Sequence, residues 1–324
     1  MYVATVSNSS HGSEAKHSAQ SLPEKHVELY NTISAMLQKE KHYACPDWLE
    51  HGTTKKAGGR VVVDASCRAK VCRWIFRTVE HARMKRETAI IAISYLDRFL
   101  WSKSSRASRV QRVRIERARR DRREYQLVAM TSLYVAIKIN EPIEMDAMTM
   151  SQLSRGLQSA QDIISCEQDI LSCLRWKMNG PTSYQFISYI LELLPDSTNL
   201  NIALQLYTDS HRQVELSVQD PVFVPIRRSN VAVAAILNAL NGIELIDFPS
   251  EKRAAFLQSV FESFGIQSDS PLLRLVRKRL LHISHIASRC KTRCRAPQSQ
   301  SPRRVDRFDY VRASRPHPSS CKSC

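Results

Sequence analysis

The sequence predicts an all-α protein made of two tandem five-helix bundles, with one more helix before the first bundle. Apolar residues recur at helical spacing along most of the chain, and no segment alternates as a half-buried strand does. Only 8 of the 324 residues are glycine, which suits packed helices. The Asn-Gly-Pro break at 179–181 separates two sets of five predicted helices. The chain is also long enough for two domains that each bury a core.

We predict four regions along the chain. Residues 1–22 and 289–324 are polar and unpatterned, which is typical of disordered segments, and the second of these is strongly basic. Between them we expect a first domain over 23–180, including a basic insert at 102–124, and a second domain over 181–288.

The first predicted helix covers about 24–39, and a loop containing Pro46 and the pair Gly58–Gly59 follows it. In the first bundle the third helix is stopped by Pro142, because the residue before a proline disfavours helical geometry. The predicted helices of this bundle are about 65–83, 86–101, 125–140, 145–156 and 160–176.

The second bundle repeats this architecture with little sequence identity. The third helix of each set is rich in small and β-branched residues (AMTSLYVAI, then NVAVAAILNAL) and can be packed on all sides. The predicted helices of the second bundle are about 182–194, 200–217, 227–240, 251–264 and 270–288.

The net charge of +17 is concentrated in two segments. The insert at 102–124 has ten basic and three acidic side chains, and residues 288–324 have ten basic and two acidic. The remaining body is nearly neutral, so the charge says little about its main task. We expect the insert to be a mobile cationic arm or a partial helix, since arginine is a good helix former.

Nucleic-acid contact and nuclear import are functional interpretations of the insert. A tolerated surface insertion, or a mistranslated segment of the gene, is the plainer interpretation, and we favour it slightly. The insert has no aromatic side chain on which a base could stack. In the tail, Ser301 precedes a proline and two arginines, and it is a candidate site of proline-directed phosphorylation.

Several classes of function are disfavoured. The N-terminus lacks the apolar region of a signal peptide, and the longest apolar runs are far shorter than a membrane span. We find no Gly-rich phosphate loop, no nucleophile with a spaced base and no paired carboxylates, so we expect neither an enzyme nor a cofactor.

The nine cysteines indicate a reducing compartment, with thiols acting as small buried hydrophobes. Cys67, Cys72, Cys166 and Cys173 fall in predicted helices. The C-terminal cysteines have irregular spacings, so we favour free thiols over a structural zinc site.

Asp97 lies in a predicted helix, ETAIIAISYLDRFLW, that is apolar on nearly every face. A buried carboxylate costs several kcal/mol unless a cation meets it. Arg98 points in a different direction, so the partner must come from another element. Arg68, in the helix that has to pack on this one, is the best candidate; the alternative is that both residues are solvated.

Four segments in order, CRAKVCRWIF, RETAIIAISYLDRFL, YQLVAMTSLYVAIKINEP and CEQDILSCLRWKMNGPTSYQFI, resemble the cyclin box. The resemblance covers about 65–190 and is nearest to D-type and diatom-type cyclins; residues 182–288 fit the second cyclin fold in helix count only. It implies a non-catalytic regulatory subunit that forms a heterodimer with a cyclin-dependent Ser/Thr protein kinase and activates it in cell-cycle control. It also implies a buried Arg68–Asp97 pair, and a location in the nucleus and cytoplasm.

The resemblance also places a kinase-binding site. Lys138 and Glu167 match the charged residues with which the family grips the kinase. Lys138 could instead be an ordinary lysine whose stem covers apolar surface. Apolar positions of the same surface could equally belong to the core; they are Val135, Ile139, Leu171 and Met178.

A second family site docks Arg-x-Leu motifs of protein substrates and inhibitors. The residues at its positions are Cys67, Val71, Trp74 and Gln126. Lys70 and Arg77 depart from the family pattern, and a cation there would repel the arginine of the motif. We therefore expect weak or altered docking.

The alternative from another class is a protein like transcription factor IIB, which uses the same double fold to bind DNA and the transcription machinery. The near-neutral body, the absence of an N-terminal zinc ribbon and the matches at Lys138 and Glu167 argue against it. Nucleic acid is therefore an unfavoured partner, and a membrane is not expected.

Overall fold

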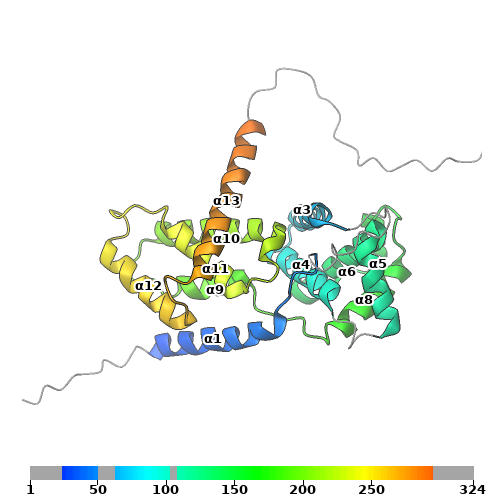
Figure 1. The fold of residues 1–324 in the computed structure, drawn as a ribbon, viewed down its shortest axis with the longest axis horizontal. Coiled ribbons are helices and arrows are strands. Elements are labelled where there is room, and N and C mark those ends of the chain that lie inside the picture. The colour runs from blue at the N-terminus through cyan, green and yellow to red at the C-terminus, as the bar shows by residue number, and fades with distance from the viewer. Residues whose placement is uncertain (1–23, 50–62, 103–107, 295–324) are drawn as a thin grey trace, which may run out of the picture. The chain divides into compact units, whose positions relative to one another are not determined.

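The computed structural model describes residues 24–49, 63–102 and 108–294. This part of the chain contains twelve α-helices and two short 3₁₀ helices, and no strand (Figure 1). The predicted all-α class is therefore confirmed. None of the helices in these ranges is both long and apolar enough to cross a membrane.

Most helices lie within a few residues of their predicted positions. The first is α1 (Glu24–Glu40), which the 3₁₀ turn η1 (Lys41–Tyr43) follows. The next group is α3 (Ala65–His81), α4 (Arg86–Trp101), α5 (Arg109–Arg120), α6 (Arg122–Asn140), α7 (Ala147–Leu153) and α8 (Ala160–Cys173). The last group is α9 (Ser183–Leu191), α10 (Leu200–Gln219), η2 (Pro221–Phe223), α11 (Arg228–Leu240), α12 (Ser250–Phe264) and α13 (Pro271–Cys294).

Local sequence signals set many of the helix starts. Asp64 accepts a hydrogen bond from the backbone N–H of Cys67 at the start of α3. Ser159 and Thr182 each begin a reciprocal capping box, at α8 and α9. Such caps satisfy backbone N–H groups that have no partner inside the helix, so the polar residues before each apolar run determine where it begins to coil.

In the first bundle α6 lies at the centre. Its residues from Leu127 to Ile137 are all buried, and α4, α5 and α8 pack around it. In the second bundle α11 has the same role, with α9 and α10 against it. Small and β-branched side chains allow this close approach from several directions, as the composition of both helices predicts.

The predicted first domain included the N-terminal helix, but α1 packs against α12 and α9 of the second bundle. At its end the carboxylate of Glu40 is buried and accepts hydrogen bonds from Ser229, in the first turn of α11, through both the backbone N–H and the hydroxyl. An acidic group is favourable at the N-terminal end of a helix. The chain then crosses to the first bundle along η1.

The basic insert is the main difference from the predicted layout. We expected either a mobile cationic arm or a partial helix, and the structure shows a helix. Residues 109–120 form α5, which packs against α6 and α4. Ile115 and Ala118 are buried there. The first bundle therefore has six helices in its described part, one more than predicted.

The described residues up to His285 form one compact unit, and a second unit begins at Ile286. Helix α13 continues to Cys294, so residues 289–294 are helical where a disordered tail was predicted. The predicted disordered N-terminus and the rest of the tail, with Ser301, lie outside the described residues.

Candidate functional site

Asp97 of α4 is buried together with Arg68 of α3, and the two form a bidentate ion pair. Arg68 Nε donates to Asp97 Oδ1 at 2.9 Å, and Arg68 Nη2 donates to Oδ2 at 2.7 Å. The indole N–H of Trp48 also donates to Oδ1, at 3.0 Å. Both side chains are about 2–3% exposed, so the pair has exchanged water for protein hydrogen bonds on nearly every side.

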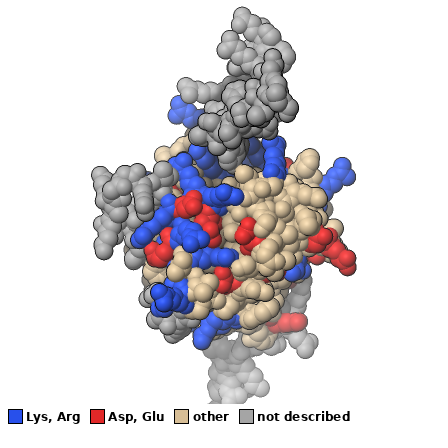
Figure 2. All heavy atoms as spheres, turned by 90° about the vertical axis from the view of Figure 1, so that its right-hand side faces the viewer, with Lys and Arg blue, Asp and Glu red and all other residues tan. Residues whose placement is uncertain are grey.

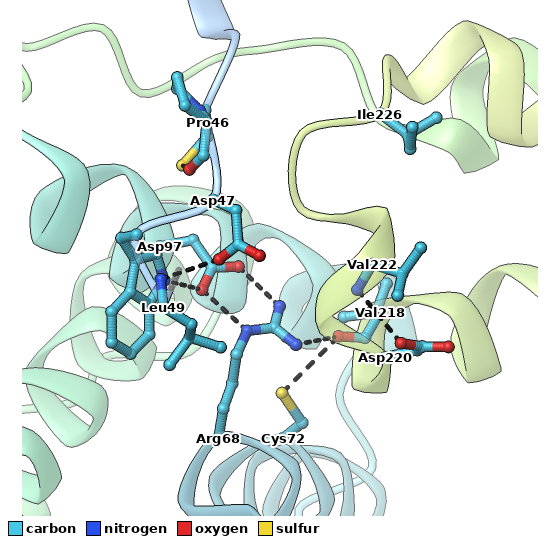
Figure 3. A network of polar contacts seen from close by, with 12 residues as sticks. Pro46, Asp47, Leu49, Arg68, Cys72, Asp97, Val218, Asp220, Val222 and Ile226 are labelled. Carbon is cyan, nitrogen blue, oxygen red and sulfur yellow. Dashed lines mark hydrogen bonds and ion pairs between the residues drawn. The ribbon is translucent and has the colours of Figure 1, made fainter. Parts of the chain in front are cut away.

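The third guanidinium nitrogen reaches the second bundle. Arg68 Nη1 donates to the backbone carbonyl of Val218 at 2.8 Å (Figure 3). Val218 lies in the last turn of α10, where carbonyl groups have no partner inside the helix. The positive charge of Arg68 is also favourable at this C-terminal end of α10, because the helix dipole is negative there. The pair thus joins three segments: α3, α4 and the end of α10.

Ionisation follows from this geometry. Burial disfavours the charged form of Arg68, but the Asp97 carboxylate more than offsets this, so the pKa of Arg68 lies above its usual value. Burial raises the pKa of the neighbouring Cys72 thiol to about 11 and that of Cys45 to about 12. These thiols are neutral at physiological pH and are poor nucleophiles.

A second polar cluster lies on the surface of the first bundle. Lys138, in the last turn of α6, places Nζ 2.8 Å from Glu167 Oε1 of α8. The ammonium also lies 4.9 Å from the centroid of the Tyr134 ring. The hydrogen bond to Glu167 raises the pKa of Lys138, and burial only partly opposes this. Lys138 keeps further N–H donors and Glu167 keeps a second oxygen, so each can bind a partner as well.

Partly exposed apolar side chains lie on the same two helices as this ion pair. Ile164, Glu167 and Leu171 are three or four residues apart and therefore share one face of α8. Ile164 is 38% exposed, Leu171 is half-buried, and Ile139, next to Lys138, is 41% exposed. A charged pair among exposed apolar groups is typical of a protein interaction surface.

Two of the predicted contact residues are not on this surface. Val135 and Met178 are buried in the hydrophobic core. The structure brings Lys138 and Glu167 together, and Leu171 lies on the same face of α8 as Glu167.

Trp176 is a further candidate for this surface that our reading of the sequence missed. It is 73% exposed, and both Arg175 and Trp176 adopt left-handed backbone conformations just after α8 ends at Cys173. Its backbone N–H donates to the carbonyl of Leu171, so the backbone of Trp176 lies close to the end of α8. The signal in the sequence is its position at the predicted end of the helix over about 160–176.

The predicted docking residues lie along α3 and at the start of α6. All four are partly exposed; they are Cys67, Val71, Trp74 and Gln126. Lys70 and Arg77 are exposed on α3. The expectation of weak or altered docking at this strip stays a prediction. In the described ranges, no three His, Cys, Asp or Glu side chains are grouped so that they could hold a metal ion.

The described residues define an all-helical protein with two bundles and an ion pair on the surface of the first. A family model, "Cyclin, N-terminal domain", matches residues 32–179. The chain is 23% identical to mouse G1/S-specific cyclin-D1 over 215 residues, which are 66% of this chain and 67% of that protein. It is 25% identical to Cyclin-D1-1 of Arabidopsis thaliana, over 65% of this chain and 57% of the relative.

The fold is also similar to a solved viral cyclin from herpesvirus saimiri. The TM-score is 0.56 at 15% identity, with 79% of this chain and 97% of that chain covered. Residues 32–179 therefore match the N-terminal domain of cyclins, and the chain is similar to the D-type cyclins.

Proposed function

We propose that this protein is a non-catalytic regulatory subunit that binds a cyclin-dependent Ser/Thr protein kinase and activates it in cell-cycle control. The similarity to cyclins supports a regulatory role with a kinase partner. The observation that carries the proposal is the Lys138–Glu167 ion pair, 2.8 Å across, among exposed apolar side chains.

The surface around Lys138 and Glu167 could both bind a helix of the kinase and fix its orientation. The apolar groups Ile139, Ile164 and Trp176 would contribute area, while the ion pair would fix register and orientation. Holding the kinase αC helix inward completes the Lys–Glu ion pair and the magnesium geometry on which phosphoryl transfer depends. In this proposal the chemistry belongs to the kinase, and the cyclin acts in the nucleus and cytoplasm.

The test uses a double variant, Lys138→Ala with Glu167→Ala. Because both partners are removed, no unpaired charge remains, and the loss of one surface ion pair costs at most about 1 kcal/mol of stability. The matched control is Asp269→Ala with Lys278→Ala, which removes one exposed acidic and one exposed basic side chain from the second bundle.

Each protein is used to pull down partners from its own cell lysate, and the eluate is assayed for histone kinase activity. We expect wild type and control to recover activity and the double variant to bind the kinase roughly thirtyfold more weakly, the loss typical of an interface hot spot. Equal activity with all three proteins would refute the assigned surface. Recovery of nucleic acid or transcription machinery without kinase activity would favour the function of transcription factor IIB.

A further inference from the structure

Helix α5 exposes arginines over most of its outer face. Arg114 and Arg119 point inward: Arg114 Nε lies 3.2 Å from Asp169 of α8, and Arg119 donates to the carbonyl of Leu100. The others are exposed, as are the two arginines that begin α6; they are Arg109, Arg112, Arg117, Arg120, Arg122 and Arg123.

The acidic side chains nearby balance only part of this charge, and Glu124 of α6 lies 4.0 Å from Arg117. On residues 108–123 only Glu116 and Asp121 are exposed acids. Glu116 already pairs with Arg119 and Arg120, and Asp121 accepts the backbone N–H of Arg123 at the start of α6. Figure 2 shows the face that carries α5, with Lys and Arg side chains gathered on one part of it and fewer acidic ones among them.

Apolar side chains lie within the same outer face. Val110 is 67% exposed and Val113 is 50% exposed. At 100° per residue, Val113 projects between Arg109 and Arg117. The face therefore offers guanidinium groups for carboxylates or phosphates, and aliphatic surface between them.

This face is separate from the surface around Lys138. Ser165 and Asp169 of α8 contact Arg114 of α5, whereas Glu167 is turned by about 160–200° around the helix and meets Lys138. A partner on α5 would leave that ion pair accessible.

We propose that the outer face of α5 is a docking surface for an acidic peptide segment of a partner protein, in which apolar side chains alternate with acidic ones. Arg109 and Arg120 are eleven residues apart, about 16 Å along the helix, which about five residues of extended peptide would span. Duplex DNA would engage the arginines through its phosphates but would gain nothing from the two valines, so the mixed face favours a peptide.

The test measures fluorescence anisotropy of labelled peptides with the full chain at physiological ionic strength. The probe alternates Glu with Leu; two matched peptides replace Glu by Gln or Leu by Ser. Arg109→Gln with Arg120→Gln removes two charges while keeping helix propensity. The control, Arg274→Gln with Lys278→Gln, removes two exposed charges from α13.

We expect the Glu–Leu peptide to bind the Arg109/Arg120 variant about fivefold more weakly than wild type, and the control to change by less than about twofold. Val110→Ser with Val113→Ser should weaken the binding of the Glu–Leu peptide about threefold and leave the binding of the Glu–Ser peptide unchanged.

Equal binding of the Glu and Gln peptides to the wild type, or equal losses of affinity in both charge variants, would overturn the proposal. A DNA duplex that binds more tightly than the Glu–Leu peptide, with equal affinity for the wild type and the valine variant, would also overturn it and would indicate a nucleic-acid partner. Because the surfaces differ, the proposal stands or fails independently of kinase binding.

Discussion

Asp97 is stabilised by groups from two different segments, Trp48 and Arg68, and Arg68 is in turn bound to a carbonyl of α10. A buried carboxylate is tolerated when its lone pairs and its charge are both matched. Here the matching also orients α3 on α4 and fixes the last turn of α10 against them.

Substitution of Asp97 by Ala should therefore be strongly destabilising. It leaves the Arg68 guanidinium buried without its counter-charge, a situation that costs about 3–5 kcal/mol. Urea unfolding followed by circular dichroism measures the change in the free energy of unfolding.

The control for this prediction is Arg68→Met together with Asp97→Leu. Replacing both charges by apolar groups of similar size removes the orphaned cation, so the double variant should be more stable than Asp97→Ala. If Asp97→Ala costs no more than about 1 kcal/mol, the pair behaves like a surface ion pair and the interpretation is wrong.

Sequence reasoning could identify the two ends of this pair but not its surroundings. A carboxylate in an apolar helix requires a cation, and Arg68 on the neighbouring helix is a natural one. Val218, whose carbonyl accepts a hydrogen bond from Arg68, is 150 residues away from Arg68 in the sequence. This contact depends on how the second bundle packs against the first. No local pattern contains that information.

At the scale of the element, α5 is part of the first bundle and not an appendage. Its inner face consists of little more than Ile115 and Ala118, which are 3% and 0% exposed. Arg119 and Arg114 add contacts to Leu100 and Asp169 on either side. The interpretation as a tolerated surface insertion therefore needs a test.

We expect Ile115→Ala to destabilise the fold by about 2–4 kcal/mol, because it leaves a cavity between α5 and α6. Val113→Ala, on the exposed side of the same helix, should change stability by no more than about 0.5 kcal/mol. Thermal unfolding of both variants and of the wild type measures the difference in stability. Equal stability of the two variants would show that α5 is dispensable for packing.

The helices were predictable wherever the apolar period was strong, as in α4, α6 and α11. The α5 segment was harder, because one short apolar stripe is hidden among ten basic residues in 102–124. Its capping box, Ser108 with Gln111, is the signal that could have placed the start of the helix. The sequence alone could not distinguish the exposed apolar side chains near Lys138 from core residues, because exposure depends on which side chains the neighbouring helices bury.

At the scale of the whole molecule, the two bundles up to residue 285 belong to one compact unit. Helix α10 packs against α3 and α4, and α1 packs against α12 before the chain enters the first bundle. Arg86 of α4 also forms a bidentate pair with Glu215 of α10, whose second partner is the hydroxyl of Tyr184. Contacts of this kind couple the stability of one bundle to that of the other.

Phe256→Ala tests this coupling, because damage to the second bundle should then weaken the first. Phe256 lies in α12, is 1% exposed and packs on Phe248, so its removal should cost about 3–5 kcal/mol. All four tryptophans precede residue 177, so their fluorescence reports on the first bundle, whereas circular dichroism reports on all helices. In a single cooperative unit both signals should shift together to lower urea concentration. Independent bundles would instead leave the fluorescence transition at its wild-type position. Leu275→Ala, at a 59% exposed position of α13, should shift neither signal, which separates the loss of core packing from a general effect of removing a side chain.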